Sequence, residues 1–93
     1  MAANTITTTG AGSFGVRVDS GTVVGVNSSV TTSGGGAALR FNFGPGLIDL
    51  TNTPVLATGA GTVGIENLNL STGMDTVRMT GGSLISQSSD AII

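Results

Sequence analysis

The chain has 93 residues, 16 of them glycine, and carries three basic and five acidic side chains for a net charge of −2. It contains no cysteine and no histidine, which excludes a disulfide scaffold and a zinc site built on those ligands. Three arginines and three phenylalanines are too few to neutralise a phosphate backbone and stack bases, so nucleic-acid binding is excluded as well. With 39% apolar residues, the chain is too hydrophobic for a disordered linker rich in glycine and serine.

No stretch contains the roughly 18 consecutive apolar residues that a membrane helix needs. The N-terminal segment also lacks the basic flank and apolar run of a signal peptide. We therefore expect no membrane insertion by this segment.

One block recurs along the chain. It begins with an aliphatic residue, continues through threonine or serine into a glycine-rich run, and ends in an alternating apolar pattern. The leading aliphatic residues are Ile6, Val30, Val55 and Leu84, so successive copies lie 24, 25 and 29 residues apart. We place the extra residues of the third interval around 67–73. Self-similarity at a nearly fixed spacing is typical of repeat architectures.

A second pattern lies between the copies of this block, at 24–29, 48–54 and 77–83. In each segment, two apolar residues flank one other residue and a polar corner follows. Alternation with a period of two, bounded by glycine, serine, asparagine and aspartate, predicts short strands. No segment combines helix-forming residues with apolar residues three and four positions apart, so we expect no helix.

A period of 24 to 29 residues with two or three short strands predicts a β-solenoid, in which each repeat forms one coil on the next. We expect residues 1–93 to form a single all-β segment, a right-handed parallel β-helix of about three and a half coils, with the handedness that parallel crossovers generally adopt. The repeat alignment predicts three apolar core columns: Ile6, Val30, Val55 and Leu84; Val16, Leu39 and Ile65; and Val26, Leu50 and Met79.

The same alignment predicts which charged side chains are neighbours on the outer face. One outward position holds Arg17, Arg40 and Glu66, and another holds Gly25, Asp49 and Arg78. Opposite charges then meet at Arg40 with Glu66 and at Asp49 with Arg78, each pair contributing about 0.2–1 kcal/mol. Arg17 beside Arg40 is mildly repulsive.

The glycine-containing block resembles a known repeat. Its copies at 6–18, 30–41 and 55–67 are similar to the passenger-domain repeats of Gram-negative type V autotransporters, the pertactin-like family. The resemblance implies a right-handed parallel β-helix at the bacterial cell surface or secreted, which serves adhesion or another virulence role. A host-surface protein or glycan would bind through the full-length parent. The chain lacks an autochaperone-like C-terminal segment and an Arg-Gly-Asp tripeptide.

The chain stops inside the fourth copy of the block, at 84–93. We therefore expect it to be a fragment of a longer passenger domain. Each end of such a fragment exposes a cross-section of the apolar core and unpaired backbone groups. This predicts end-to-end self-association.

Catalytic and metal-binding groups are scarce. A serine or threonine nucleophile needs a base, and the chain has neither histidine nor lysine. No two acids stack on each other in the repeat alignment, which argues against a glycosidase, and Asp19, Asp75 and Asp90 are too isolated for a calcium site. The glycine runs at 34–36 and 59–61 are corners, because no helix and no lysine follow them as in a phosphate-binding loop.

We therefore expect a non-enzymatic structural segment with no cofactor and no metal. Two alternatives stay open. The chain could belong to a carbohydrate-active β-helix enzyme whose catalytic residues lie elsewhere, or it could be a self-assembling fibrous solenoid.

Phe14, Phe41 and Phe43 are the aromatic residues of the chain. One interpretation buries Phe41 beside Val18 and places Phe14 or Phe43 in a corner. The other makes Phe43, Gly44, Pro45 and Gly46 an exposed loop tip that contacts a partner, because Gly-Pro-Gly forces a turn and solenoid loops often form a binding surface. We take these four residues as the candidate partner-contact loop.

Overall fold

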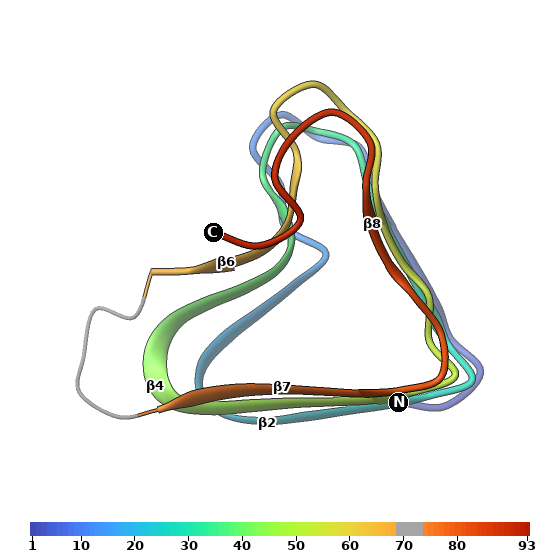
Figure 1. Ribbon diagram of the computed structural model, residues 1–93, viewed down its shortest axis with the longest axis vertical. Coiled ribbons are helices and arrows are strands. Elements are labelled where there is room, and N and C mark those ends of the chain that lie inside the picture. The colour runs from blue at the N-terminus through green and yellow to red at the C-terminus, as the bar shows by residue number, and fades with distance from the viewer. Residues whose placement is uncertain (69–73) are drawn as a thin grey trace.

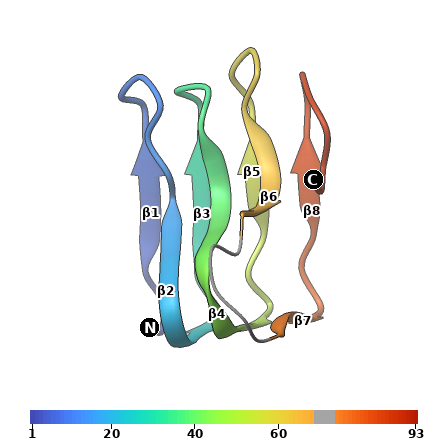
Figure 2. The same ribbon diagram turned by 90° about the vertical axis from the view of Figure 1, so that its left-hand side faces the viewer.

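The computed structural model describes residues 1–68 and 74–93, which form a right-handed parallel β-solenoid (Figures 1 and 2). Each coil is roughly triangular, and the strands of successive coils lie side by side and parallel. Three coils are followed by the start of a fourth, so the predicted fold is confirmed. The strands of the described residues are β1 (Thr5–Thr8), β2 (Val16–Val26), β3 (Ser29–Thr32), β4 (Ala37–Thr51), β5 (Val55–Ala57), β6 (Val63–Asn67), β7 (Asp75–Thr80) and β8 (Leu84–Ser86).

The described residues contain no helix, as the residue pattern predicts. Accordingly, this part of the chain offers no helix that is long and apolar enough to span a membrane.

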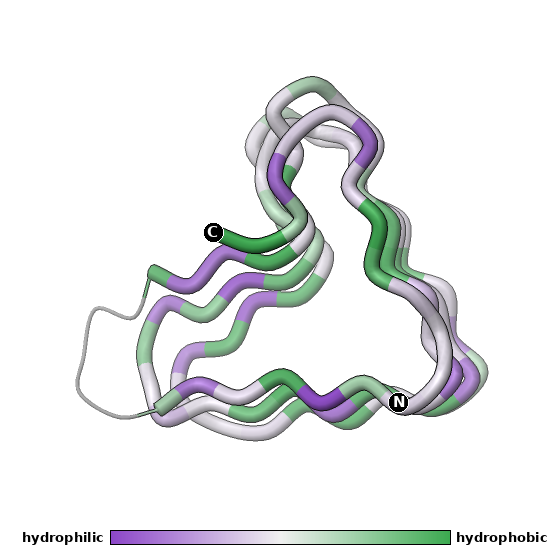
Figure 3. Tube along the Cα trace, in the orientation of Figure 1, coloured by the Kyte–Doolittle hydropathy of each residue, from purple (hydrophilic) through white to green (hydrophobic). Residues whose placement is uncertain are grey.

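The first side of the triangle is a single sheet with the order β1-β3-β5-β8. Its strands pair in one unbroken register, which sets Ile6 beside Val30, Val30 beside Val55, and Val55 beside Leu84. Alternate side chains point inward, and Val30 and Val55 are fully buried. The predicted first column is therefore confirmed. Figure 3 shows apolar residues recurring at the same place in each coil on this side.

The strands β2 and β4 bend in mid-course, so each supplies two sides of the triangle (Figure 1). Their first parts form the second side with β6, where Val16, Leu39 and Ile65 are neighbours as predicted. Their later parts form the third side, where β7 pairs with β4. The side chains of all three sides meet in one apolar core, in which Leu39 and Phe41 are buried.

The third predicted column is wrong by one residue in the first coil. Gly25, and not Val26, pairs with Leu50, while Leu50 pairs with Met79 as predicted. The column therefore has no side chain in the first coil. Met1 occupies this space in part, since its Cε lies 3.3 Å from where a Cβ on Gly25 would stand.

The error arises because the second corner, between the second and third sides, varies in length. Val23, Ile48 and Val77 are register neighbours on the third side, as Val16, Leu39 and Ile65 are on the second. From the second-side residue to the third-side residue, the chain advances seven residues in the first coil, nine in the second and twelve in the third. Aligning Val26 with Leu50 places one of the additional residues of the second coil at the third corner, whereas the structure places it at the second corner. The outer row shifts in the same way, so Val24, and not Gly25, lies beside Asp49. Of the extra residues expected around 67–73, those at 69–73 lie outside the described part of the chain.

The third corner, between the third side and the next coil, keeps a constant length because one left-handed residue turns the chain there in each coil. Ala3, Asn27, Asn52 and Gly81 share this position, with φ angles of 54°, 50°, 48° and 69°. Asparagine and glycine adopt this conformation with little strain. The Asn52 Nδ2 also donates a hydrogen bond to Asn27 Oδ1 at 3.4 Å, which links two coils.

The first corner, between the first and second sides, stacks backbone directly on backbone. A Cβ on Gly34 would collide with the carbonyl of Gly10, and a Cβ on Gly59 would collide with the carbonyl of Ser33. Glycine is required at these positions because any side chain would push the coils apart. The predicted role of the two glycine runs as corners is therefore confirmed.

We predict that Gly34→Ala destabilises the fold more than Gly35→Ala. Gly34 has no room for a methyl group, whereas the nearest atom to a Cβ on Gly35 is 3.6 Å away. Gly35 has a positive φ of 90°, so its alanine variant loses about 1–2 kcal/mol from backbone strain alone. Urea unfolding followed by circular dichroism measures both losses. Equal losses would mean that backbone dihedrals, and not the contact between coils, limit this corner.

Candidate functional site

The residues of the candidate partner-contact loop lie at the second corner. Phe43, Gly44, Pro45 and Gly46 form the bend inside β4, so they are a strand corner and not a protruding loop tip. Gly44 and Gly46 are buried, while Pro45 is exposed and Phe43 is 37% exposed. The Gly44–Pro45 peptide is cis. From the first coil, the Ser20 hydroxyl donates a hydrogen bond to the Gly44 carbonyl at 3.0 Å, so the bends of two coils are tied together.

Phe41 fills the core beneath this bend. It pairs with Val18, as one interpretation of the aromatic residues predicts, and it is 1% exposed. A Cβ on Gly46 would lie 2.9 Å from the Phe41 Cδ1 and 3.1 Å from the Val18 Cγ1. Gly46 therefore lets the strand turn closely over the aromatic ring.

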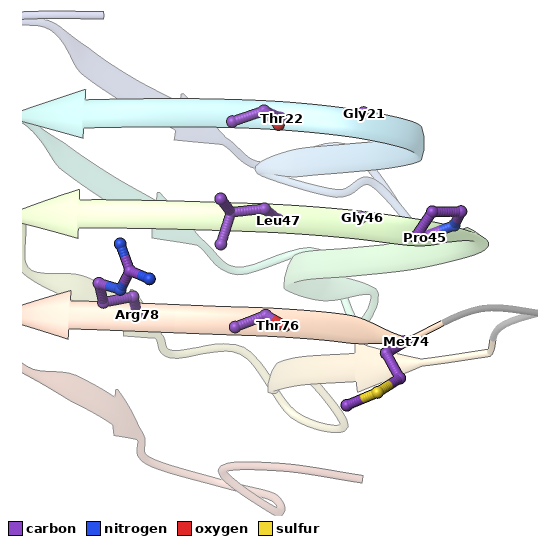
Figure 4. Close-up of a pocket in the computed structure, with 8 residues that line it drawn as sticks. All are labelled: Gly21, Thr22, Pro45, Gly46, Leu47, Met74, Thr76 and Arg78. Carbon is purple, nitrogen blue, oxygen red and sulfur yellow. The ribbon is translucent and has the colours of Figure 1, made fainter.

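A shallow groove of about 390 Å³ runs along the outside of the third side, next to this corner (Figure 4). It crosses three coils, because its residues come from β2, β4 and β7 and from Met74 just before β7. Its lining consists of Gly21, Thr22, Pro45, Gly46, Leu47, Met74, Thr76 and Arg78. Pro45 and Gly46 thus belong both to the candidate partner-contact loop and to the groove.

The chemistry of the groove follows from its outward row. Thr22, Leu47 and Thr76 are register neighbours, so a half-buried aliphatic side chain lies between two exposed hydroxyls. Arg78 borders the row and is paired with Asp49 at 3.4 Å. The groove can therefore offer hydroxyl donors and acceptors, a small apolar floor and one guanidinium group. Among the lining residues that the structure describes, no hydroxyl stands beside a base that could activate it.

The sequence pattern did not single out Thr22, Leu47, Thr76 or Met74. The first three could be found by continuing the outward row of the third side, once the second corner had been given its correct length. Met74 is 81% exposed and precedes β7. Met74 lies outside the repeated positions, so the repeat pattern could not have identified it as a groove residue.

The predicted ion pairs between coils are confirmed. Arg40 Nε lies 3.9 Å from Glu66 Oε2, and Arg78 pairs with Asp49. Arg17 stands beside Arg40 as predicted. Arg17 also binds Asp19 through two hydrogen bonds of 3.1 and 2.8 Å, which the repeat alignment did not reveal because both residues belong to one strand. The hydrogen bond and the negative charge of Asp19 raise the pKa of Arg17.

Arg40 is held on the second side by more than its ion pair. Its guanidinium carbon lies 4.5 Å from the centroid of the Phe14 ring. The Arg40 side chain is 20% exposed, compared with 50% for Arg17. Phe14 therefore covers an arginine on the outer face, and a cation over an aromatic face adds attraction that grows as water is removed.

The acidic residues show no paired arrangement for catalysis in the described structure. Asp19, Asp49 and Glu66 each face an arginine. Asp75 Oδ1 accepts a hydrogen bond from the Gly46 N–H at 3.0 Å, while its Oδ2 is buried without a hydrogen-bond partner among the described residues. No group of three potential metal ligands occurs within residues 1–68 and 74–93.

Comparisons with protein-family models, with curated proteins and with solved structures give no match. The function must therefore be inferred from the coils, the second corner and the groove.

We predict that Gly46→Ala lowers the free energy of unfolding, and that Phe41→Leu in the same chain restores part of the loss. The added methyl group meets the Phe41 ring at 2.9 Å, and leucine removes the ring atoms it meets. Phe41→Leu alone is also destabilising, because it reduces buried apolar volume. A double-mutant cycle by urea unfolding measures the coupling between the two sites. Strictly additive losses would show that contact with the Phe41 ring is not the reason that position 46 requires glycine.

Replacing Arg40 by glutamine is predicted to destabilise the protein by about 1 kcal/mol, and Arg17→Gln by less. Arg40 loses both the Phe14 ring and Glu66, whereas Arg17 loses an exposed pair with Asp19. Thermal unfolding at low and high salt measures the difference. A larger effect at Arg17 would contradict the importance of the ring contact.

Proposed function

We propose that the chain is a non-enzymatic structural segment of a surface-exposed bacterial autotransporter passenger, an adhesin or virulence factor. In this role it acts as a stiff stalk that holds binding regions of the parent protein away from the membrane. The observation that carries the proposal is the unbroken register of the first side, in which four strands from successive coils share one apolar column.

This register supports a mechanical role because hydrogen-bonded strands join neighbouring coils on all three sides of the triangle. Parallel strands are spaced about 4.8 Å apart, so each coil of about 25 residues adds only that much length. Such a stack is short for its residue number, but it cannot bend without breaking hydrogen bonds on one side. The stalk is therefore stiff, but it is short for its number of residues.

The carbohydrate-active enzyme is less well supported by the described residues. Glycoside hydrolysis uses two carboxyl groups that face each other across a sugar. In this chain, three acids are engaged with arginines on outer faces and Asp75 bonds to the backbone of β4. An enzyme of this kind would have to place its catalytic residues outside these 93.

Contact with a host-surface protein or glycan, if made by this segment, is best supported at the second corner. Phe43 and Pro45 are exposed there, and the groove beside them offers threonine hydroxyls and the Arg78 guanidinium. These groups can hydrogen-bond to a peptide backbone or to sugar hydroxyls.

Antibodies raised against the folded 93-residue chain test the proposed function on intact source cells. We expect them to label unpermeabilised cells and to detect a polypeptide much larger than 9.0 kDa on an immunoblot. The physical reason is that a stalk segment is displayed outside the membrane as part of a longer stack. Brief protease treatment of intact cells is expected to remove the signal.

An antibody against an abundant cytosolic protein provides the control, since it must label only permeabilised cells. Labelling by the anti-solenoid antibody only after permeabilisation would contradict the surface location. Cleavage of oligosaccharides by the folded chain would contradict a purely structural role.

A further inference from the structure

The groove beside the second corner presents its polar groups in a fixed arrangement on one face of a sheet. Ile48 lies in the core, so alternation along β4 turns Leu47 outward, and its register neighbours Thr22 and Thr76 flank it on the adjacent coils. Figure 4 shows this row across three strands, with Arg78 farther along the strand of Thr76. Two strand spacings separate the two threonines, a distance of about 10 Å between their Cα atoms.

The backbone of the groove floor is not available to a ligand. Residues 46–51 of β4 pair with β2 on one side and with β7 on the other. A peptide that binds by adding a strand needs an unpaired backbone edge, and the middle of this sheet offers none. A ligand in the groove is therefore recognised through side chains: the threonine hydroxyls, the Arg78 guanidinium and the apolar surface of Pro45, Leu47 and Met74.

The residues that line the groove carry one positive charge and no negative charge. The Arg78 side chain is 64% exposed, and among the described residues it donates one hydrogen bond, from Nη1 to Asp49 Oδ2 at 3.4 Å. A guanidinium group has five N–H donors, so most of this group can bind a carboxylate from outside. The planar fork of a guanidinium matches a carboxylate, whereas a single arginine gives little hold on a phosphodiester chain.

We propose that the groove binds an acidic oligosaccharide, a chain of sugars that bear carboxylate groups. Sugar hydroxyls hydrogen-bond to the hydroxyls of Thr22 and Thr76, the C–H face of a ring packs on Leu47, and a sugar carboxylate pairs with Arg78. At least two rings are required, because the two threonines are farther apart than one sugar ring is wide. The inference rests on the proposed contact at the second corner, but not on the location of the chain at the cell surface.

An acidic peptide would supply the same charge but fits the groove less well. Its backbone groups find no strand to pair with, and the groove is shallow and spread over three coils, so it does not enclose a side chain. A sugar ring carries hydroxyls at its edges and C–H groups on its faces. This distribution matches a half-buried leucine between two exposed threonines.

The ion pair at the edge of the groove gives the proposal a specific signature. A sugar carboxylate must compete with Asp49 for the Arg78 guanidinium. Asp49→Asn is therefore expected to raise the affinity, while Arg78→Gln is expected to lower it about tenfold, as for a lost hydrogen bond to a charged group. Both variants break the same pair within the protein, so a merely structural role of the pair would change binding in the same direction in both.

Titration of the isotope-labelled chain with tetragalacturonic acid, followed by NMR shifts of the backbone amides, tests this inference. We expect saturable shifts centred on Thr22, Leu47, Thr76 and Arg78, with an affinity that falls as salt is added. The methyl ester of the same tetrasaccharide has the same rings without the charges, and it is expected to bind about tenfold more weakly. A tetramer of mannuronic acid is titrated in parallel, because the groove does not dictate one linkage.

Matched variants separate the groove from the rest of the surface. Arg17→Gln removes another exposed arginine that is paired with an acid, on a different side of the triangle, and it is expected to leave the affinity unchanged. Thr76→Val is expected to weaken binding about threefold through the loss of one hydroxyl. Thr80→Val, at an exposed position of the same strand outside the groove, is expected to have no effect. Circular dichroism checks that each variant is folded.

The absence of saturable shifts with both acidic tetrasaccharides would overturn the inference. Equal affinities for tetragalacturonic acid and its methyl ester would also overturn it, as would a loss of affinity in Asp49→Asn. Tighter binding of tetraglutamate than of either tetrasaccharide would assign the groove to an acidic peptide instead. These measurements use the purified chain, so their failure is distinct from a failure of the surface location, which antibody labelling of intact cells tests.

Discussion

The parallel ladder between coils is the constraint on which the rest of the structure depends. Each coil must present its hydrogen-bonding groups and its inward side chains at the same places as the coil before it. The first side satisfies this requirement without any shift over four strands. Leu39 and Phe41 on the second side and Ile48 and Leu50 on the third pack against that fixed side. A coil with a different perimeter can be accommodated only where the ladder is interrupted, and this happens at the corners.

The three corners meet this constraint in different ways. The first corner removes side chains, so that Gly34 and Gly59 lie against backbone carbonyls of the preceding coil. The third uses a left-handed residue, which is asparagine at 27 and 52. The second combines a register shift beyond Val18 with the close approach of Gly46 to Phe41. Buried hydroxyls assist, as where the Thr8 and Thr32 Oγ1 atoms bond across coils at 3.0 Å.

The sequence alone was sufficient for the fold class, the strand sides and most neighbours between coils, because apolar alternation and the spacing of the repeats survive in every copy. It failed where a corner changes length. Val26 was aligned with Leu50 because both precede a polar corner, but the inserted residue is taken up before the third side begins. The bend at Phe43–Gly46 resembled a loop because its glycines and proline suit a turn. In the structure the first coil pairs with both of its ends, at Phe43 and Gly46, and the third coil pairs with Gly46. The Arg17–Asp19 contact lies within one strand, so a comparison between coils could not reveal it.

The variable length of the second corner also bears on how such a chain can change over evolutionary time. The count of residues there rises from seven to nine to twelve in successive coils, while the third corner stays constant. Residues can therefore be added at this position without displacing a core column or breaking the first-side sheet. Long surface insertions in general add little to the entropy of closing a loop. The second corner is thus the natural grafting point of this scaffold, where new sequence can be tried while the stack that carries it remains folded.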